Sequence, residues 1–221
     1  MNKEFIKKEW LYWIILISPF IYLAFEWNDL PDRMPIHWNA HGEANGFGSK
    51  VFGGLFMPLL NIGLYALFLA LPKIDPKKRN YESFGKTYRI LRLGLCLFFA
   101  VIYIIIIQIT LGNHFINEKW IAILVCALIA FLGNYLRTVR PNWFVGIRTP
   151  WTLASPEVWK RTHEAGGRLL FYAGLLGIIL ECILSADYSW IPVALVIATA
   201  LFSVAYSFVL FKKLERNAGS A

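Results

Sequence analysis

Six long apolar runs constrain this chain most strongly, and they cover roughly residues 10–27, 51–71, 90–112, 120–136, 169–185 and 190–211. Each run is near the length of about 17–25 residues that an α-helix needs to cross a bilayer. Apolar residues make up 57% of the chain and charged residues only 16%, whereas charged residues are about a quarter of soluble domains. The pattern predicts an all-α integral membrane protein with six transmembrane helices.

The basic residues predict how these helices are oriented. Of the 22 lysines and arginines, only Arg33, Lys50 and Lys119 fall on one side of the predicted membrane, and all others fall in or beside segments on the opposite side. Because positive charge is retained on the cytoplasmic side, we expect both termini to lie inside the cell. The formal net charge of +8 is then a topology signal with some attraction to anionic lipid, and it gives no argument for direct binding of nucleic acid.

The polar intervals divide the chain into three parts. Residues 1–72 hold two predicted spans and an external loop at 26–50, residues 73–89 form a basic cytoplasmic loop, and residues 90–221 hold four spans and a cytoplasmic segment at 137–168. In the external loop, Pro31 and Pro35 bias their predecessors toward extended backbone. Asn45 and Gly46 indicate a turn, since both tolerate positive φ. We therefore expect this loop to be extended and to end in a turn.

The external loop also contains our candidates for contact with a ligand, which are His37, Trp38, Asn39, His41, Gly42, Gly46 and Lys50. Two of these are histidines, and carboxylates lie nearby at Asp29, Asp32 and Glu43. Zinc accepts such ligands only in convergent geometry, and an extended loop does not bring residues four apart together. A metal-dependent membrane enzyme is therefore a lesser alternative, and we expect neither metal nor cofactor.

The cytoplasmic segment contains a predicted helix start at Ser155. Serine is a preferred N-cap, and the proline and glutamate that follow it suit the first helical turn. We expect a short interfacial helix that ends at Gly166 and Gly167. On such a helix Trp159 and His163 are four residues apart and share one face.

Polar residues inside the spans leave a second function open. Glu181 is the one ionisable residue that we expect well inside a span, and intramembrane acids often mark a functional path. A transporter or lipid-handling protein is therefore an alternative. Asn61, Gln108 and Asn134 are expected to form interhelical hydrogen bonds. The sequence contains no His-Glu-x-x-His, Gly-x-Ser-x-Gly or phosphate-binding glycine motif, and we predict that the protein is not an enzyme.

Two groups of residues form recognisable motifs. The cytoplasmic group is Asn134, Arg140, Pro141, Asn142, Gly146, Arg148, Thr149, Pro150, Trp151, Thr152, Trp159, Thr162, His163, Gly166, Gly167 and Arg168. This group resembles the SdpI family of bacterial polytopic membrane immunity proteins. The external residues 35–39, Gly42 and 46–50 resemble the small domain of unknown function that often precedes the core of that family.

The resemblance implies a protein of the bacterial cytoplasmic membrane that confers resistance to a secreted peptide toxin. The best-studied kind of relative also acts as a receptor, which recruits a cytoplasmic autorepressor of the ArsR type to the membrane. A toxin and a repressor are thus the implied partners, together with membrane lipids. Because the charge pattern places residues 137–168 inside, we expect toxin recognition at residues 26–50 and in the spans. Residues 137–168 are expected to form a structural platform or a signalling surface.

Overall fold

The computed structural model describes residues 3–39, 44–117, 119–185, 188 and 190–219. Within this part of the chain, six helices are long and apolar enough to cross a membrane. They are α1 (Lys3–Glu26), α2 (Lys50–Ile74), α3 (Asn80–Thr110), α4 (Lys119–Leu136), α6 (Pro156–Ile183) and α7 (Trp190–Gly219). A short helix α5 (Pro150–Ala154) precedes α6, and strands β1 (Arg33–Trp38) and β2 (Ala44–Ser49) lie between α1 and α2. The predicted helical membrane architecture is confirmed, and a small hairpin is added to it.

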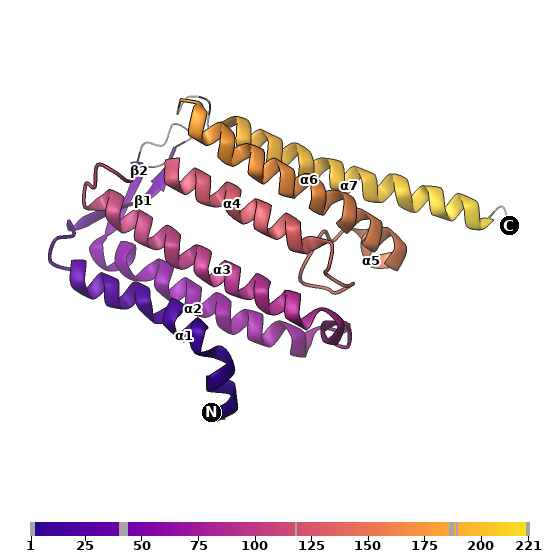
Figure 1. The fold of residues 1–221 in the computed structure, drawn as a ribbon, viewed down its shortest axis with the longest axis horizontal. Helices are drawn as coiled ribbons and strands as arrows, with labels where there is room; N and C mark the ends of the chain where they lie inside the picture. Colours follow the sequence, from indigo (N-terminus) through magenta and orange to yellow (C-terminus); the bar gives the residue numbers. More distant parts are fainter. Residues whose placement is uncertain (1–2, 40–43, 118, 186–187, 189, 220–221) are drawn as a thin grey trace.

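The helices form two groups that lie side by side (Figure 1). Helices α1, α2 and α3 pack together with the hairpin at one end, while α6 packs against both α4 and α7. Contacts between α3 and α4 join the two groups. Helix α7 continues past the other helices at the end opposite the hairpin (Figure 1).

The two ends of the bundle differ in charge. The hairpin end, residues 26–39 and 44–50, carries Glu26, Asp29 and Asp32. The opposite end carries the α2–α3 connection, residues 137–168 and the end of α7, and most of the cations lie there (Figure 1). We call it the basic end. The basic intervals that are far apart in the sequence therefore do come together in space.

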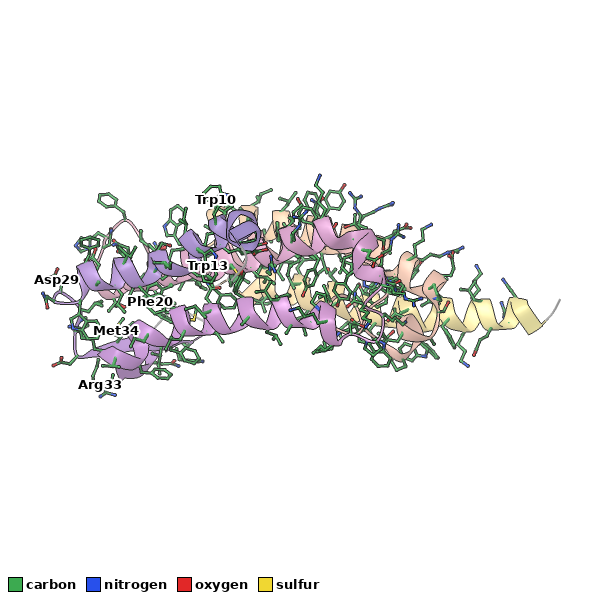
Figure 2. The ribbon with its side chains drawn as sticks, turned by 90° about the horizontal axis from the view of Figure 1, so that it is seen from below. Trp10, Trp13, Phe20, Asp29, Arg33 and Met34 are labelled. Atoms are coloured by element: carbon green, nitrogen blue, oxygen red, sulfur yellow. The ribbon has the colours of Figure 1, made fainter. Side chains whose placement is uncertain are left out.

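The buried side chain of Met34 packs the hairpin against the bundle. Met34 of β1 has no exposed surface, and it packs in a cluster with Tyr103 and Ile107 of α3. Figure 2 shows Met34 beside Arg33 and Asp29 at one end of the molecule. The proline-biased segment forms a strand because it buries one side chain against the helices. A two-stranded hairpin needs such packing to be stable.

The expectation of extended backbone in this loop is confirmed, but the predicted turn is wrong. Asn45 and Gly46 belong to strand β2, where Gly46 pairs with His37 at an irregular point of the ladder. A Cβ atom on Gly46 would lie 2.8 Å from the Cβ of His37. The glycine therefore permits close approach of the two strands, while the connecting residues 40–43 lie outside the described residues.

The basic interval at 73–89 is a shorter connection than predicted. Helix α2 continues to Ile74 and α3 begins at Asn80, so only residues 75–79 are not helical. Phe84 has a non-helical backbone conformation, with φ of −128° and ψ of 19°. The first turn of α3 is thereby kinked relative to the rest of the helix.

The predicted helix end at Gly166 and Gly167 is also wrong, because α6 passes through both residues without a break. A Cβ on Gly166 would lie 2.7 Å from the Oγ of Ser203 on α7. A Cβ on Gly167 would lie 2.9 Å from the carbonyl oxygen of Gly133 on α4. Small residues let membrane helices approach closely, and these two glycines therefore serve packing against both neighbours.

The contact between α4 and α6 depends on small residues along its length. A Cβ on Gly174 would lie 2.4 Å from the backbone nitrogen of Ala130, and one on Gly133 would lie 2.4 Å from the backbone nitrogen of Phe171. Backbone atoms cannot move aside as flexible side chains do. The two helices therefore approach as closely as their backbones allow, and this fixes the residues at their basic ends relative to one another.

Candidate functional site

The family-like residues of the segment 137–168 form a compact structure at the basic end, which we call the platform. Asn142 organises its first loop. The buried Oδ1 atom accepts hydrogen bonds from the backbone N–H groups of Phe144 and Val145 at 2.9 and 2.6 Å. Its Nδ2 atom donates to the carbonyl oxygens of Arg140 and Val145, each at 2.9 Å. One asparagine amide thus replaces regular secondary structure as the source of backbone hydrogen bonds.

Asp75 ties this loop to the α2–α3 connection. Its side chain is 2% exposed and accepts from the hydroxyl of Tyr81 at 2.9 Å and from the backbone N–H of Trp143 at 3.0 Å. The neighbouring Asn80 donates from Nδ2 to the carbonyl oxygen of Pro141 at 2.6 Å. Our sequence reasoning missed Asp75. The signal was a lone acid beside a proline in a basic interval, which is typical of a residue that fixes a turn.

Trp159 and His163 share one face of α6 as predicted, and they form the centre of the platform. Their rings stack with centroids 4.1 Å apart. The Nδ1 atom of His163 lies 2.8 Å from the carbonyl oxygen of Trp159, and its Nε2 atom accepts from the backbone N–H of Ile147 at 3.0 Å. The indole of Trp159 donates to the carbonyl oxygen of Val139 at 2.9 Å. Both ring nitrogens of this histidine are therefore used to hold the loop.

Gly146 completes the contact with His163. It has a φ of 120°, which L side chains rarely adopt, and a Cβ there would lie 2.4 Å from Nε2 of the histidine. Only glycine combines this conformation with this close approach. The predicted family residues Gly146 and His163 are thus brought into direct contact.

Helix α5 joins the platform to α7. Thr149 and Thr152 cap it reciprocally, with the Oγ1 of Thr149 accepting from the backbone N–H of Thr152 at 3.1 Å. The Thr149 hydroxyl also lies 3.0 Å from the hydroxyl of Ser207. The Trp151 ring packs against Phe208, with centroids 4.9 Å apart. The predicted N-cap at Ser155 is confirmed too, since its Oγ accepts from the N–H of Val158 at 3.3 Å.

Other motif residues have more varied positions. Arg148 is exposed and donates from a terminal nitrogen to the carbonyl oxygen of Trp143 at 2.7 Å. Arg140 is exposed, Pro150 is the first residue of α5, and Thr162 is fully buried. The platform is therefore built mainly by side-chain bonds to backbone, and its arginines project from the surface.

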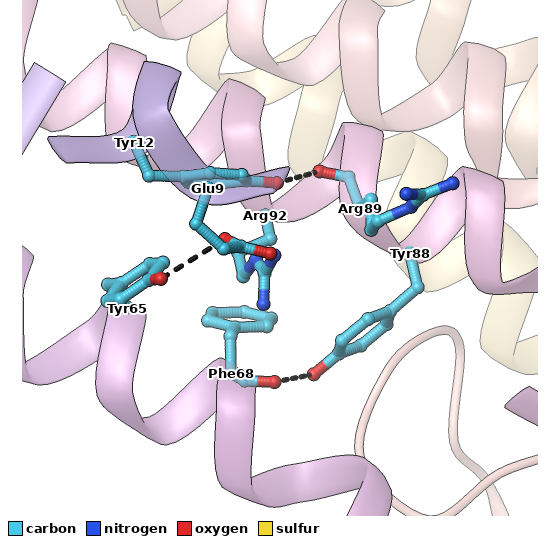
Figure 3. Close-up of polar contacts among 7 residues, drawn as sticks. All are labelled: Glu9, Tyr12, Tyr65, Phe68, Tyr88, Arg89 and Arg92. Carbon is cyan, nitrogen blue, oxygen red and sulfur yellow. Dashed lines mark hydrogen bonds and ion pairs between the residues drawn. The ribbon is translucent and has the colours of Figure 1, made fainter. Parts of the chain in front are cut away.

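A buried ion pair lies within the α1–α3 group. Glu9 and Arg92 have side chains that are 8% and 5% exposed, and one guanidinium nitrogen lies 2.7 Å from both carboxylate oxygens. Tyr65 donates to the carboxylate at 3.1 Å, and the guanidinium lies 4.4 Å from the ring centroid of Tyr12 (Figure 3). Tyr12 in turn donates to the carbonyl oxygen of Arg89 at 2.7 Å. Three helices therefore meet at one desolvated charge pair.

This pair corrects the expectation that Glu181 is the one ionisable residue well inside a span. The charge pattern predicts that Arg92 is one of the cytoplasmic topology charges, yet it is buried. The sequence signal for the buried pair is that Arg92 lies just inside the third apolar run and that an acid, Glu9, lies at the corresponding end of the first apolar run. Glu181 itself is 3% exposed and lies near the end of α6.

The expected interhelical hydrogen bonds are confirmed for two of three residues. Asn61 donates to the carbonyl oxygen of Cys96 at 3.0 Å, and Gln108 donates to the hydroxyl of Tyr22. Asn134 is exposed instead, and its amide bonds to no other side chain or backbone group in the described part of the chain. It lines a pocket of about 370 Å³ with Gly133, Arg137, Gly167, Arg168, Phe171 and Tyr172.

The residues predicted to contact a ligand at the hairpin end divide into anchoring and exposed residues. Lys50 donates to the carbonyl oxygen of Leu30 at 2.8 Å and lies 4.9 Å from the ring centroid of Trp27, so it anchors the hairpin. His37 is exposed, with its Nδ1 atom 2.5 Å from Oδ1 of Asn45. Trp38 and Asn39 are partly buried, and His41 and Gly42 lie outside the described residues. Among the described residues no cluster of potential metal ligands is found.

Six membrane-length helices define a multi-pass helical membrane protein. Residues 138–209 match the SdpI/YfhL protein family, and residues 14–62 match a domain of unknown function, DUF1648. The immunity protein SdpI of Bacillus subtilis (strain 168) is 24% identical over 209 residues, which cover 95% of this chain and 98% of that protein. No solved structure matches. The C-terminal part of the chain is thus similar to the SdpI/YfhL family, and the region ahead of it is similar to DUF1648.

Proposed function

We propose that this protein is a membrane immunity protein that protects its cell against a secreted peptide toxin. The observation that carries the proposal is the similarity to the immunity protein SdpI, which extends over 95% of the chain and includes both the hairpin and the platform. The protein acts by binding rather than by catalysis. Its membrane is the bacterial cytoplasmic membrane, and both termini lie inside because most cations gather at one end.

The hairpin is the proposed site of toxin recognition. Met34 is buried and holds the hairpin on the bundle, which leaves the side chains of Ile36 and Phe47 43% and 48% exposed. On the same hairpin, the Nδ1 atom of His37 lies 2.5 Å from Oδ1 of Asn45. Exposed apolar side chains next to polar groups are typical of an interaction surface. With the basic end inside, this surface faces the side from which a secreted peptide arrives.

The platform is the proposed signalling surface on the cytoplasmic side. Its interior side chains hold the backbone in place, and its exposed arginines, Arg140 and Arg148, project from it. A cytoplasmic repressor of the ArsR type would contact this surface when toxin occupies the other end. The contacts of Thr149 and Trp151 with α7 offer a physical link between the platform and a helix that crosses the membrane.

Survival of a toxin-sensitive strain tests the immunity function. Cells that express the protein are exposed to each candidate secreted peptide toxin encoded in the same genome, and we expect survival to rise for one of them. The double variant Ile36→Ser/Phe47→Ser should lose protection at unchanged membrane abundance. The matched control is Trp143→Ser, which removes a half-exposed aromatic residue at the basic end. This variant should still protect the cells. Absence of protection by a well-inserted wild-type protein would refute the proposal.

Labelling of intact cells tests the orientation. In a Cys182→Ser background, which removes the exposed native thiol, a membrane-impermeant maleimide should label Asn45→Cys and leave Arg79→Cys unlabelled until the cells are lysed. The reverse labelling pattern would show that the basic end lies outside the cell and the hairpin end inside.

Membrane fractionation tests the signalling role separately. A candidate repressor from the same genome should move to the membrane fraction only when the matching toxin is added. Arg140→Ala/Arg148→Ala should weaken that recruitment and leave protection intact, while Lys86→Ala/Lys213→Ala, which changes two exposed cations outside the platform, serves as a control with the same loss of charge. A repressor that stays soluble in the presence of toxin and wild-type protein would exclude the receptor role and leave the immunity role untouched.

A further inference from the structure

The pocket between α4 and α6 is lined by two arginines that have no role in the proposed recognition of a toxin. The polar side chains that line it are Asn134 of α4, Arg137, which directly follows α4, and Arg168 and Tyr172 of α6. A Cβ on Gly167 would lie 3.3 Å from the Cγ of Arg137, so the stem of this arginine lies across the helix contact, against α6. Two cations from different helices are therefore gathered at one pocket.

In the described part of the chain, neither of these cations forms an ion pair with a carboxylate. The ion pairs found there involve Arg92, Arg161 and Lys212, and none of the hydrogen bonds engages the side chains of Arg137 or Arg168. Guanidinium groups present several donors in a planar fork that matches the oxygens of phosphate. A volume of about 370 Å³ lies in the range of about 300–1,000 Å³ that small ligands occupy. The pocket is therefore suited to an anion with several oxygen atoms.

The depth of the pocket corresponds to the headgroup region of a bilayer. Helix α4 has 18 residues, which gives it a length of about 27 Å at 1.5 Å per residue, close to the hydrocarbon thickness of about 30 Å. Arg137 directly follows the last residue of this helix. Gly167 touches Gly133 across the helix contact, and so Arg168 lies at the same level. Both arginines thus lie where lipid phosphates are found.

An apolar stripe leads away from the pocket toward the hairpin end. Arg168 and Tyr172 are one helical turn apart on α6, and the following positions on the same face are apolar and exposed. These are Leu175, Leu176, Ile179 and Ile183, with exposed fractions of 40, 45, 56 and 70%. A free phosphate would use only the arginines, whereas a phospholipid would place its headgroup at the arginines and its acyl chains along the stripe.

We propose that this pocket binds the phosphate of an anionic phospholipid headgroup, with Arg137 and Arg168 as its ligands and Asn134 as an additional hydrogen-bond donor. The phosphate bridges α4 and α6 at the point where their glycines bring the backbones together. Basic pockets between membrane helices on the cytoplasmic side are known to hold such headgroups. This site is independent of toxin recognition, which is proposed for the opposite end of the molecule.

Native mass spectrometry of the full-length protein in mild detergent tests the site. The protein is titrated with phosphatidylglycerol, with phosphatidylethanolamine of the same acyl chains, and with sn-glycerol 3-phosphate as the soluble probe. Each arginine near the surface is expected to contribute about fivefold to affinity. Arg137→Gln/Arg168→Gln should therefore weaken phosphatidylglycerol binding at least about tenfold. Arg168→Gln, which changes an exposed side chain and should fold normally, should weaken it by several-fold.

Lys78→Gln/Arg79→Gln is the matched control, because it removes the same charge from two exposed residues elsewhere at the basic end. It should change phosphatidylglycerol affinity less than about twofold if the pocket is specific. Equal weakening by both double variants would show diffuse attraction and overturn the proposal. Preference for phosphatidylethanolamine, or arginine-dependent binding of sn-glycerol 3-phosphate as tight as that of the lipid, would overturn it as well. Failure of folded wild-type protein to bind phosphatidylglycerol would be equally decisive.

Discussion

Replacing Glu9 with glutamine removes the negative charge from the buried ion pair while nearly conserving side-chain volume. The guanidinium of Arg92 is expected to keep its charge, its 5% exposure and its position beside two tyrosine rings. It loses the carboxylate that lies 2.7 Å away. The variant therefore isolates the electrostatic contribution of the pair from its packing.

The size of the effect follows from burial. Removing one partner of a buried ion pair destabilises a protein by about 3–5 kcal/mol. The rings of Tyr12 and Tyr65, at 4.4 and 5.3 Å, remain beside the cation and together offset about 1 kcal/mol of this loss. We expect a net destabilisation of about 2–4 kcal/mol. At about 2–4 °C per kcal/mol for a chain of this length, the apparent melting temperature should fall by about 4–16 °C.

Thermal unfolding in detergent, followed by fluorescence-detected size exclusion, measures this shift. A double-mutant cycle with Arg92→Gln should show that the double variant is less destabilised than the sum of the single variants. Glu157→Gln is the control, because its ion pair with Arg161 is about half exposed and such pairs contribute at most about 1 kcal/mol. If Glu9→Gln melts within about 1 °C of Glu157→Gln, the pair is hydrated and the reasoning fails.

Three further variants probe packing and the platform by the same melting assay. Gly174→Ala should destabilise the protein by about 1–3 kcal/mol, since its new Cβ would meet the Ala130 backbone at 2.4 Å. The control Gly63→Ala, whose new Cβ has nothing within 4 Å, should be neutral or stabilising. Equal effects of the two variants would contradict the close α4–α6 contact. Asp75→Ala leaves three hydrogen-bond donors without their acceptor and should lower the free energy of unfolding by about 2–4 kcal/mol. An unchanged melting temperature would show that Asp75 does not hold the α2–α3 connection to the platform. Trp151→Ala should lower the melting temperature more than Lys77→Ala does, because its indole packs against α7; equal tolerance would show that α5 is not anchored there.

Local patterns predicted the features that depend on neighbouring residues. Hydropathy over about 20 residues predicted the six helices, and the Ser155 cap and the shared face of Trp159 and His163 follow from helix geometry within one or two turns. The extended backbone near Pro31 and Pro35 is likewise a local steric effect. These expectations were confirmed because each depends on covalent geometry and solvent, which a short segment carries with it.

The errors share a different cause. Gly166 and Gly167 form a helix-ending pair by local chemistry, but contacts with α4 and α7 favour a continuous helix. Asn45 and Gly46 form a turn signal by local chemistry, but pairing with β1 places them in a strand. In both cases tertiary packing outweighs an intrinsic preference of about 1 kcal/mol per residue.

The sequence by itself determined that this chain has six helices long and apolar enough to cross a membrane, that its cations gather at one end, and that it carries motifs similar to those of the SdpI/YfhL family. Only the tertiary structure decided that Glu9 meets Arg92, that Asp75 holds the platform, and that Arg137 and Arg168 share a pocket. Hydropathy and charge act between each residue and its solvent, whether lipid or water, and can be read along the chain. Ion pairs and hydrogen bonds between distant residues depend on which helix faces meet, and a one-dimensional pattern does not contain that information.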